Sequence, residues 1–149
     1  MASNESITYR KLEISDKKNY LELMNNFRPT KLDMTDIEYE DIHNHIIKNG
    51  CIIVAEFKEQ LVGSITILIE QKFIHHSSKY AHIEDVFVYE NIRNKKIGSN
   101  LIEKAIDFCK NQNIRKISLN CSQDLCKFYS RNGFEHKQVN MYMLTPSIT

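Results

Sequence analysis

Hydrophobic and polar positions along the chain follow two periods, one helical and one strand-like. Each change of period marks the boundary of a predicted helix or strand. Apolar residues at helical spacing predict a helix that Asp16 caps and that runs to about Phe27, a second helix from Asp36 to Asn49, and a third over 97–111. A short helix is predicted over 124–131, and strand-like runs cover 7–12, 51–57, 61–69, 80–88, 114–121 and 136–144. The predicted order is β-α-α-β-β-β-α-β-α-β.

The spacing of these segments predicts how they pair. Only a three-residue polar turn separates 51–57 from 61–69, which favours a hairpin, and 75–79 is polar and typical of a loop. The strand 80–88, the helix after it and the strand 114–121 predict a right-handed parallel crossover. The chain has no repeat or linker, so we expect one α/β domain over residues 1–149, with a mixed sheet flanked by helices.

The apolar stripe of each long helix predicts its buried face. In the first helix the stripe consists of Tyr20, Leu23, Met24 and Phe27. In the second helix it consists of Ile37, Ile42, Ile46 and Ile47. In the third helix it consists of Ile97, Leu101, Ile102, Ala105, Ile106 and Cys109.

Composition excludes several classes of function. Hydrophobic residues make up 42% and charged residues 26% of the 149, as in a soluble globular protein. The net charge of +1 argues against a nucleic-acid-binding surface, and no apolar run approaches the roughly 20 residues that cross a membrane. The first residues lack the apolar segment of a signal peptide, so we expect a cytoplasmic protein.

Cysteine and histidine spacing gives no metal site. The six histidines are not spaced for chelation, and no C-x-x-C pair is present. In a cytoplasmic protein the cysteines are expected as free thiols, with Cys121 and Cys126 buried as small hydrophobic side chains that carry no chemistry.

The turn before the helix 97–111 is the main candidate binding site. Arg93, Lys95, Lys96 and Gly98 follow one another there with no acid between them. Cationic side chains, unpaired N–H groups and the positive end of the helix dipole together favour a phosphate or pyrophosphate. The alternative is a plain solvated helix start, where each cation opposes the dipole at a cost of roughly a few tenths of a kcal/mol.

The same residues carry a resemblance to a known superfamily. The segment 93–98, RNKKIG, resembles the R/Q-x-x-G-x-G/A acetyl-CoA pyrophosphate loop of the GCN5-related N-acetyltransferase (GNAT) superfamily, with Lys96 in place of a glycine. The segment 128–134, FYSRNGF, resembles its F-Y-x-x-x-G-F signature. Within the superfamily, 69–75 (IEQKFIH) and 83–86 (IEDV) resemble segments of the glucosamine 6-phosphate N-acetyltransferase family.

This resemblance implies an enzyme. Its reaction would move acetyl from acetyl-CoA to the 2-amino group of D-glucosamine 6-phosphate, by direct amine attack and without a metal. The product would be N-acetyl-D-glucosamine 6-phosphate, for UDP-GlcNAc biosynthesis. The family is a homodimer whose C-terminal strand contributes to the partner subunit, and neither nucleic acid nor membrane is an expected partner. Alternatives are an acetyltransferase for a protein N-terminus, a lysine or a polyamine, and a non-catalytic acetyl-CoA sensor.

The resemblance also implies roles for single residues. Acetyl-CoA would be bound by Val86, Phe87, Val88, Arg93, Asn94, Lys95, Lys96, Ile97, Gly98, Ser99 and Tyr129. The acceptor would be bound by Lys72, Phe73, Ile74, His75, Glu84, Asp85, Arg115, Lys116 and Asn120. For catalysis, Tyr129 would protonate the leaving thiolate and the Asn120 main-chain carbonyl would orient the amine.

Elementary chemistry agrees with these roles but leaves alternatives open. A neutral amine needs mainly proximity, a strand N–H near Val86 suits the oxyanion, and a Tyr hydroxyl suits the thiolate. Neighbouring strand residues point to opposite faces, so only one of Glu84 and Asp85 can face the sugar, and we favour Glu84 as the catalytic residue at the amine or the hydroxyls. Tyr129 could instead be a core tyrosine, His75 an ordinary loop histidine, and the two acids edge-strand charges.

The chain departs from the family pattern at three places. Leu144 stands where an arginine usually reaches the sugar phosphate. Leu125 and Cys126 replace an Asn-Val pair, and the early loop 25–31 reads NNFRPTK instead of a stretch rich in Thr and Gly. We expect one of three cations to supply the missing phosphate contact: Arg28, Lys31 or Lys72.

Overall fold

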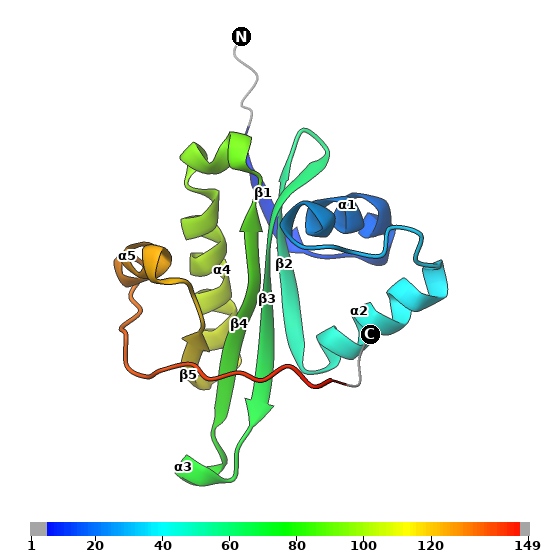
Figure 1. Cartoon of the computed structure of the whole chain (residues 1–149). Coiled ribbons are helices and arrows are strands. Elements are labelled where there is room, and N and C mark those ends of the chain that lie inside the picture. The colour runs from blue at the N-terminus through cyan, green and yellow to red at the C-terminus, as the bar shows by residue number, and fades with distance from the viewer. Residues whose placement is uncertain (1–5, 147–149) are drawn as a thin grey trace. The chain divides into compact units, whose positions relative to one another are not determined.

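The computed structural model describes residues 6–146, apart from the side chains of 93–95. It contains two compact units, one that ends at Leu119 and one that begins at Asn120. The first unit carries the sheet and the long helices, and the second carries a short helix and the C-terminal segment (Figure 1). That residues 1–149 form one acetyltransferase domain stays a prediction.

The first unit is built on a five-stranded mixed sheet. Its strands lie in chain order: β1 (Thr8–Lys11), β2 (Gly50–Phe57), β3 (Gln60–Gln71), β4 (Lys79–Val88) and β5 (Ile114–Leu119). Neighbours from β1 to β4 pair antiparallel, and β4 pairs with β5 in parallel. The predicted hairpin and the predicted parallel crossover are therefore both confirmed.

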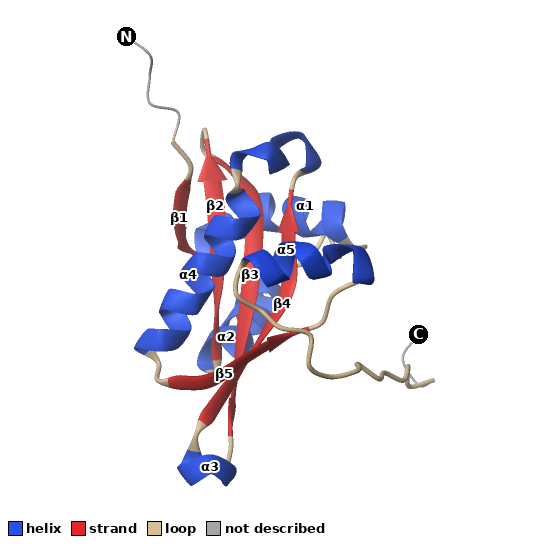
Figure 2. Cartoon of the chain, turned by 90° about the vertical axis from the view of Figure 1, so that its left-hand side faces the viewer, coloured by secondary structure: helices blue, strands red, loops and turns tan. Residues whose placement is uncertain are grey.

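Helices cover both faces of this sheet. Helix α4 (Ile97–Asn111) lies on one face, and α1 (Lys17–Phe27) and α2 (Asp36–Lys48) lie on the other (Figure 2). The short segment α3 (Ile74–Ser77) closes the tip between β3 and β4, and its backbone is left-handed at His75 and His76 (φ 50° and 58°), so it is a turn within the predicted loop rather than a regular helix. Short 3-10 helices occupy Ile14–Asp16 and Glu90–Lys95. In the second unit a 3-10 turn, Gln123–Leu125, leads into α5 (Cys126–Arg131). Within 6–146 no helix combines the length and apolar character needed to span a membrane.

The predicted buried face is right for α4, whereas on α2 only Ile46 of the predicted stripe is half-buried and packs against the core. On α4 the stripe is buried except for Ile106, which is half-buried. On α2 the side chains of Ile37, Ile42 and Ile47 are 74%, 49% and 43% exposed, and Tyr39 and His43 are buried instead. The two polar rings can face inward because each finds a backbone partner: the Tyr39 hydroxyl donates to Glu13 O at 3.1 Å, and His43 Nε2 lies 3.2 Å from Leu12 O.

Two predictions about helix start and last strand need correction. Asp16 occupies the N-cap position of α1, but its carboxylate makes no cap bond to that helix. It accepts from Glu13 N at 2.8 Å and from the Arg10 guanidinium at 2.7 and 2.8 Å. The strand predicted over 136–144 is wrong, because this segment pairs with no strand in the described chain. Alternating apolar residues form a strand only beside an edge that accepts their backbone hydrogen bonds.

Candidate functional site

A bulge in β4 marks the centre of the site. Ser64 pairs with Phe87 and Thr66 with Glu84, so a single β3 residue faces both Asp85 and Val86. Asp85 has a left-handed backbone (φ 50°), which Asp tolerates better than most residues. Strict side-chain alternation does not hold at a bulge, so the argument that placed Glu84 and Asp85 on opposite faces fails. Both side chains are exposed.

Beyond this bulge, one edge of β4 has no strand beside it in the described part of the first unit. The pairing of β4 with β5 runs from Lys79–Ile114 to Ile83–Leu119 and stops there, while β4 continues to Val88. Such an edge presents N–H and C=O groups that an extended ligand can bind as an added strand. The edge includes Val86 and Phe87, two of the three residues, with Val88, that were predicted to bind the cofactor through their backbone.

The start of α4 lies at the carboxyl end of the same strand. Lys96, its N-cap residue, is left-handed (φ 59°) and makes no side-chain cap, and the first turn holds no acid. Asn100 N donates back to Lys96 O at 3.0 Å, as the helix begins. The left-handed backbone explains why glycine suits the Lys96 position in the motif that this loop resembles. The helix start therefore suits an anion.

The residues predicted to bind the cofactor around this helix start differ in their burial. Ile97 is fully buried, so only its backbone can serve a ligand. Gly98 and Ser99 are half-buried and Lys96 is exposed. The side chains of Arg93, Asn94 and Lys95 lie outside the described residues.

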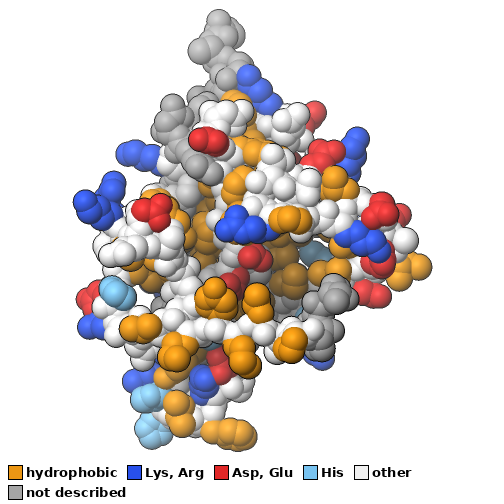
Figure 3. Space-filling view, viewed as in Figure 1, with side chains coloured by type: hydrophobic (Ala, Val, Ile, Leu, Met, Phe, Trp, Pro, Cys, Tyr) orange, Lys and Arg blue, Asp and Glu red, His pale blue; other side chains and the backbone are white. Residues whose placement is uncertain are grey.

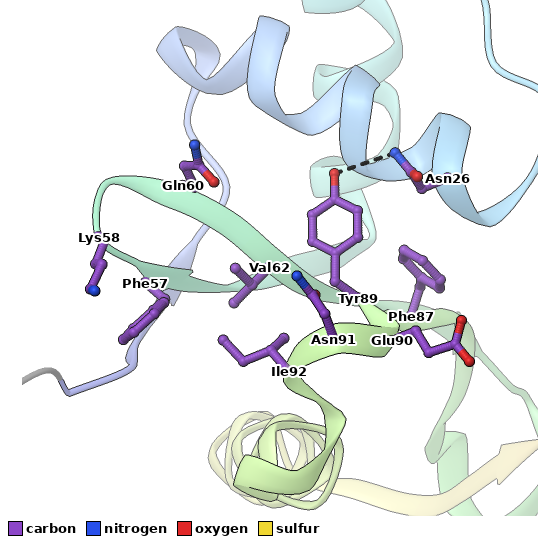
Figure 4. A pocket seen from close by; sticks show the side chains of 10 residues that line it. All are labelled: Asn26, Phe57, Lys58, Gln60, Val62, Phe87, Tyr89, Glu90, Asn91 and Ile92. Atoms are coloured by element: carbon purple, nitrogen blue, oxygen red, sulfur yellow. Dashed lines mark hydrogen bonds between the residues drawn. The ribbon is translucent and has the colours of Figure 1, made fainter.

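A cavity of about 940 Å³ opens beside the end of β4 (Figure 4). It is lined by Asn26, Phe57, Lys58, Gln60, Val62, Phe87, Tyr89, Glu90, Asn91 and Ile92. Asn26 Nδ2 donates to the Tyr89 hydroxyl at 3.4 Å, and Phe27 stacks on Phe87 with ring centroids 5.3 Å apart. Among the predicted site residues whose side chains the structure describes, only Phe87 lines this cavity. Tyr89 was missed, although it directly follows the predicted strand.

A polar chain crosses three strands at the other end of the sheet. Lys72 Nζ pairs with Glu70. The other oxygen of Glu70 lies 2.9 Å from His82 Nε2, and His82 Nδ1 lies 2.7 Å from Ser118 Oγ. Lys72, followed by His82, holds the pKa of the Glu70 carboxyl below its usual range. The sequence predicted only Lys72 of these four residues, because their contacts depend on the register between strands.

Next to this row of polar side chains, three predicted acceptor residues lie around the buried Tyr80 ring. Lys116 Nζ lies 4.3 Å and Lys72 Nζ 5.4 Å from its centroid, and the His75 ring lies 6.3 Å away. Phe73 and Ile74, predicted with them, are instead 99% and 59% exposed at the β3–β4 tip. Figure 3 shows hydrophobic and histidine side chains side by side where α3 lies. Arg115 is exposed.

The second unit holds the remaining predicted residues. Asn120, its first residue, is exposed, and Tyr129 on α5 is buried. The Tyr129 ring packs edge-on against Phe128 and Phe134, at 5.0 and 6.1 Å between centroids. Burial, with a smaller effect of charge on Cys121, raises the pKa of the Tyr129 hydroxyl. A raised pKa keeps this hydroxyl protonated at neutral pH, as a hydrogen-bond donor must be.

The cysteines are free thiols, as predicted, but their burial differs from the prediction. Cys51 and Cys109 are buried, whereas Cys121 is exposed and Cys126 is half-buried. Cys121 is therefore not the buried hydrophobic side chain that was expected. The described residues contain no group of three or more His, Cys, Asp or Glu side chains that could hold a metal.

The chain thus has a mixed sheet with a bulged β4, an open β4 edge and an uncapped helix start. Its sequence also matches known proteins. Residues 18–134 match the model of the acetyltransferase (GNAT) family. The chain belongs to this family. The matched region reaches into both units, and the mixed sheet with flanking helices is the GNAT fold. The chain is thus an acetyltransferase, and enzymes of this family take their acetyl group from acetyl-CoA.

Relatives narrow the comparison. The chain is 34% identical, over 143 residues, to the glucosamine 6-phosphate N-acetyltransferase of Arabidopsis thaliana, covering 92% of this chain and 95% of that one. It is 30% identical to glucosamine 6-phosphate N-acetyltransferase 1 of Dictyostelium discoideum, covering 96% and 95%. A crystal structure of the enzyme named glucosamine-6-phosphate N-acetyltransferase from Arabidopsis thaliana superposes with a TM-score of 0.87 at 32% identity, covering 94% and 99%.

Proposed function

We propose that the chain transfers acetyl from acetyl-CoA to the 2-amino group of D-glucosamine 6-phosphate. The observation that carries this proposal is the 34% identity to the Arabidopsis enzyme of that name over 92% of the chain. The product is N-acetyl-D-glucosamine 6-phosphate, the form in which an amino sugar enters UDP-GlcNAc biosynthesis.

The donor site comprises the open β4 edge and the start of α4. The backbone of Val86 to Val88 binds the extended pantetheine arm as an added strand. The N-terminus of α4, with Lys96 beside it, binds the pyrophosphate, and Arg93 to Lys95 complete the loop. The geometry fits this donor because a polar extended arm needs an open strand edge, as at Val86 and Phe87, and an anion needs an uncapped helix start next to it.

The acceptor amine attacks the thioester carbonyl directly. The amine nitrogen forms the new C–N bond, the C–S bond breaks, and a proton passes to the departing sulfur. Holding the amine against the carbonyl is the main task, and the Asn120 carbonyl orients it while Glu84 binds the amine or the sugar hydroxyls. A backbone N–H near Val86 stabilises the oxyanion, and the protonated Tyr129 donates to the thiolate.

The sugar phosphate binds near the cations around Tyr80. Leu144, which stands in place of the family's arginine, is 84% exposed and has no charge. Among its possible replacements, Lys31 pairs with Glu38 at 2.9 Å, and the Arg28 guanidinium lies on the Phe27 ring at 4.5 Å. Lys72 also pairs with an acid, Glu70, but its ammonium group and that of Lys116 both lie near the Tyr80 ring, so two cations are available there. We therefore assign the phosphate contact to Lys72.

One assay tests the proposal. The release of CoA thiol from acetyl-CoA is followed with purified protein, with and without glucosamine 6-phosphate, and the product is identified by mass. Glucosamine without phosphate, peptides with a free N-terminus or lysine, and spermidine serve as competing acceptors. A kcat/KM for glucosamine 6-phosphate well above all others supports the proposal. Faster turnover of a peptide or polyamine contradicts it, and no turnover of any amine indicates a sensor.

We further propose that the enzyme is a homodimer. The segment after α5 is apolar and exposed, with Val139, Met141, Tyr142, Met143 and Leu144 between 82% and 90% exposed. Exposed apolar runs of this kind are typical of an interface with another subunit. Light scattering on the full chain should give twice the monomer mass, and Met141→Asp with Met143→Asp should give the monomer mass. A wild-type monomer would contradict this assignment.

The proposed location is the cytoplasm. All four cysteines are free thiols, which fits a reducing compartment. Cell fractionation with an antibody against the full chain tests this, and recovery in a secreted or membrane fraction would refute it.

A further inference from the structure

Two cysteines of the second unit lie in contact with each other. The Sγ atoms of Cys121 and Cys126 are 3.9 Å apart. Cys121 is exposed and Cys126 half-buried, whereas Cys51 and Cys109 are buried. A disulfide requires the two sulfurs to approach to about 2.05 Å, a movement of roughly 2 Å from this contact. The pair is thus close enough to join and open enough for a small oxidant to reach.

The position of the pair in the chain gives it a consequence. Cys121 directly follows Asn120, and Cys126 lies three residues before Tyr129, about one turn away on α5. Charge on Cys121 is also the smaller cause of the raised pKa of the Tyr129 hydroxyl, after burial. The two cysteines therefore sit on the same short segments as the residues assigned to amine orientation and thiolate protonation.

We propose that Cys121 and Cys126 are a modification site at which hydrogen peroxide forms a reversible intramolecular disulfide. The Cys126 sulfur attacks one peroxide oxygen, the O–O bond breaks, and a water molecule departs. Cys126 then carries a sulfenic acid. The Cys121 sulfur then attacks this sulfur, the S–S bond forms, the S–O bond breaks and a second water leaves. Two thiols are oxidised by two electrons and one peroxide is reduced to two waters.

The structure favours this outcome over further oxidation of a single thiol. A sulfenic acid with a thiol in contact condenses to a disulfide, and one without such a neighbour advances to sulfinic acid. Cys51 and Cys109 are shielded from the oxidant by burial. Peroxide should therefore consume the Cys121–Cys126 pair before the other two thiols react.

The disulfide should also slow acetyl transfer, and this consequence rests on the proposed function. Drawing the sulfurs together displaces the segments that carry Asn120 and Tyr129. Because a shift of about 1 Å in catalytic geometry can cost up to roughly a hundredfold in rate, we expect kcat to fall at least about tenfold. Dithiothreitol should restore it.

Peptide mass tests the covalent step without reference to activity. The full chain is treated with peroxide, its free thiols are capped with N-ethylmaleimide, and it is digested with trypsin. Cleavage after Lys116 and Lys127 gives one peptide, residues 117–127, that contains both cysteines. The expected peptide carries no cap and is lighter by two hydrogens, and dithiothreitol before capping makes it take up two caps. A doubly capped peptide, a sulfinic acid or a cross-link between chains would overturn the proposal.

Variants separate this inference from the proposed function. Cys126→Ser should abolish the reversible loss of activity, and the matched control Cys51→Ala should retain it. If reduced protein does not acetylate glucosamine 6-phosphate, the proposed function fails while the peptide mass still decides the disulfide. If the disulfide forms and kcat is unchanged, its coupling to the site is refuted.

Discussion

The imidazole of His82 joins Ser118 to Glu70, with Nδ1 2.7 Å from the hydroxyl and Nε2 2.9 Å from the carboxylate. The same carboxylate pairs with Lys72, so the histidine fixes the acid that fixes the lysine. We propose that His82 is a positioning residue for the acceptor site, acting on the substrate through Lys72. Its role differs from that of a residue that packs the core, because its side chain is 40% exposed.

Replacing His82 tests this chain of contacts. His82→Phe should raise KM for glucosamine 6-phosphate several-fold, because Glu70 would lose the partner that holds it beside Lys72. kcat and KM for acetyl-CoA should stay near wild type. Steady-state kinetics with each substrate varied decide this, with His76→Gln, an exposed histidine at the tip, as the control. Equal loss for both substrates would mean that His82 serves only folding.

Tyr129→Phe should lower kcat by about a hundredfold while the Kd of acetyl-CoA is retained. Burial raises the pKa of this hydroxyl above its usual value of about 10. The protonated, active form is therefore present at all lower pH, and Tyr129 should cause no fall of kcat below pH 10. A pH–rate profile and calorimetric titration with acetyl-CoA measure both effects. Tyr142→Phe, an exposed tyrosine of the same unit, is the control. An unchanged kcat in Tyr129→Phe would assign the residue to the core.

Lys96→Gly should separate backbone strain from phosphate binding. Glycine relieves the left-handed backbone at φ 59° and should raise the free energy of unfolding by about 0.5–1 kcal/mol. Loss of the cation should raise KM for acetyl-CoA several-fold. Urea denaturation and kinetics report the two effects. Glu59→Gly, at φ 63° in the β2–β3 turn, should gain stability without any change in KM. A similar KM for Lys96→Gly and wild type would exclude Lys96 from the donor site.

The Arg10–Asp16 pair should make stability depend on acid pH. The Arg10 guanidinium, held at 2.7 Å, is the largest cause of a lowered pKa of Asp16. A carboxyl with a lowered folded pKa stabilises the fold above its unfolded pKa of about 3.9, and this stabilisation is lost as pH falls through the folded pKa. Asp16→Asn should cost about 1–2 kcal/mol at pH 7 and flatten the pH dependence below pH 4.

Urea titrations between pH 2 and 7 measure this dependence. The control is Asp36→Asn, whose wild-type carboxylate pairs with Lys17 at 2.7 Å but is 93% exposed. An exposed pair contributes about 0.5 kcal/mol or less. Equal losses for both variants would show that burial of Asp16 has no effect.

The period of apolar residues predicted those parts of the fold that depend only on residues close together in the sequence. The stripe from Ile97 to Cys109 has one period and one face, so α4 was predicted with its buried side. The face of α2 was wrong because Tyr39 and His43 turn inward to backbone oxygens of Glu13 and Leu12, which are distant in sequence. The strand over 136–144 was wrong because pairing needs a neighbour that no pattern within the segment supplies.

The candidate site also has one part that the sequence predicted and another that it did not. The basic turn before α4 was visible as consecutive residues. The bulge at Asp85 was not, because it depends on how β4 lies against β3. Likewise Glu70, His82 and Ser118 meet only through the register of three strands, and no spacing along the chain indicates their contact.

The early end of the β4–β5 ladder sets a limit on engineering this enzyme. The β4–β5 pairing of the described chain ends at Ile83, and we propose that the donor binds in a groove at the edge of β4 beyond it. Substitutions that extend the ladder would raise the melting temperature and close the groove. A search for thermostable variants should therefore leave 84–88 alone and draw its gains from positions such as the exposed isoleucines of α2.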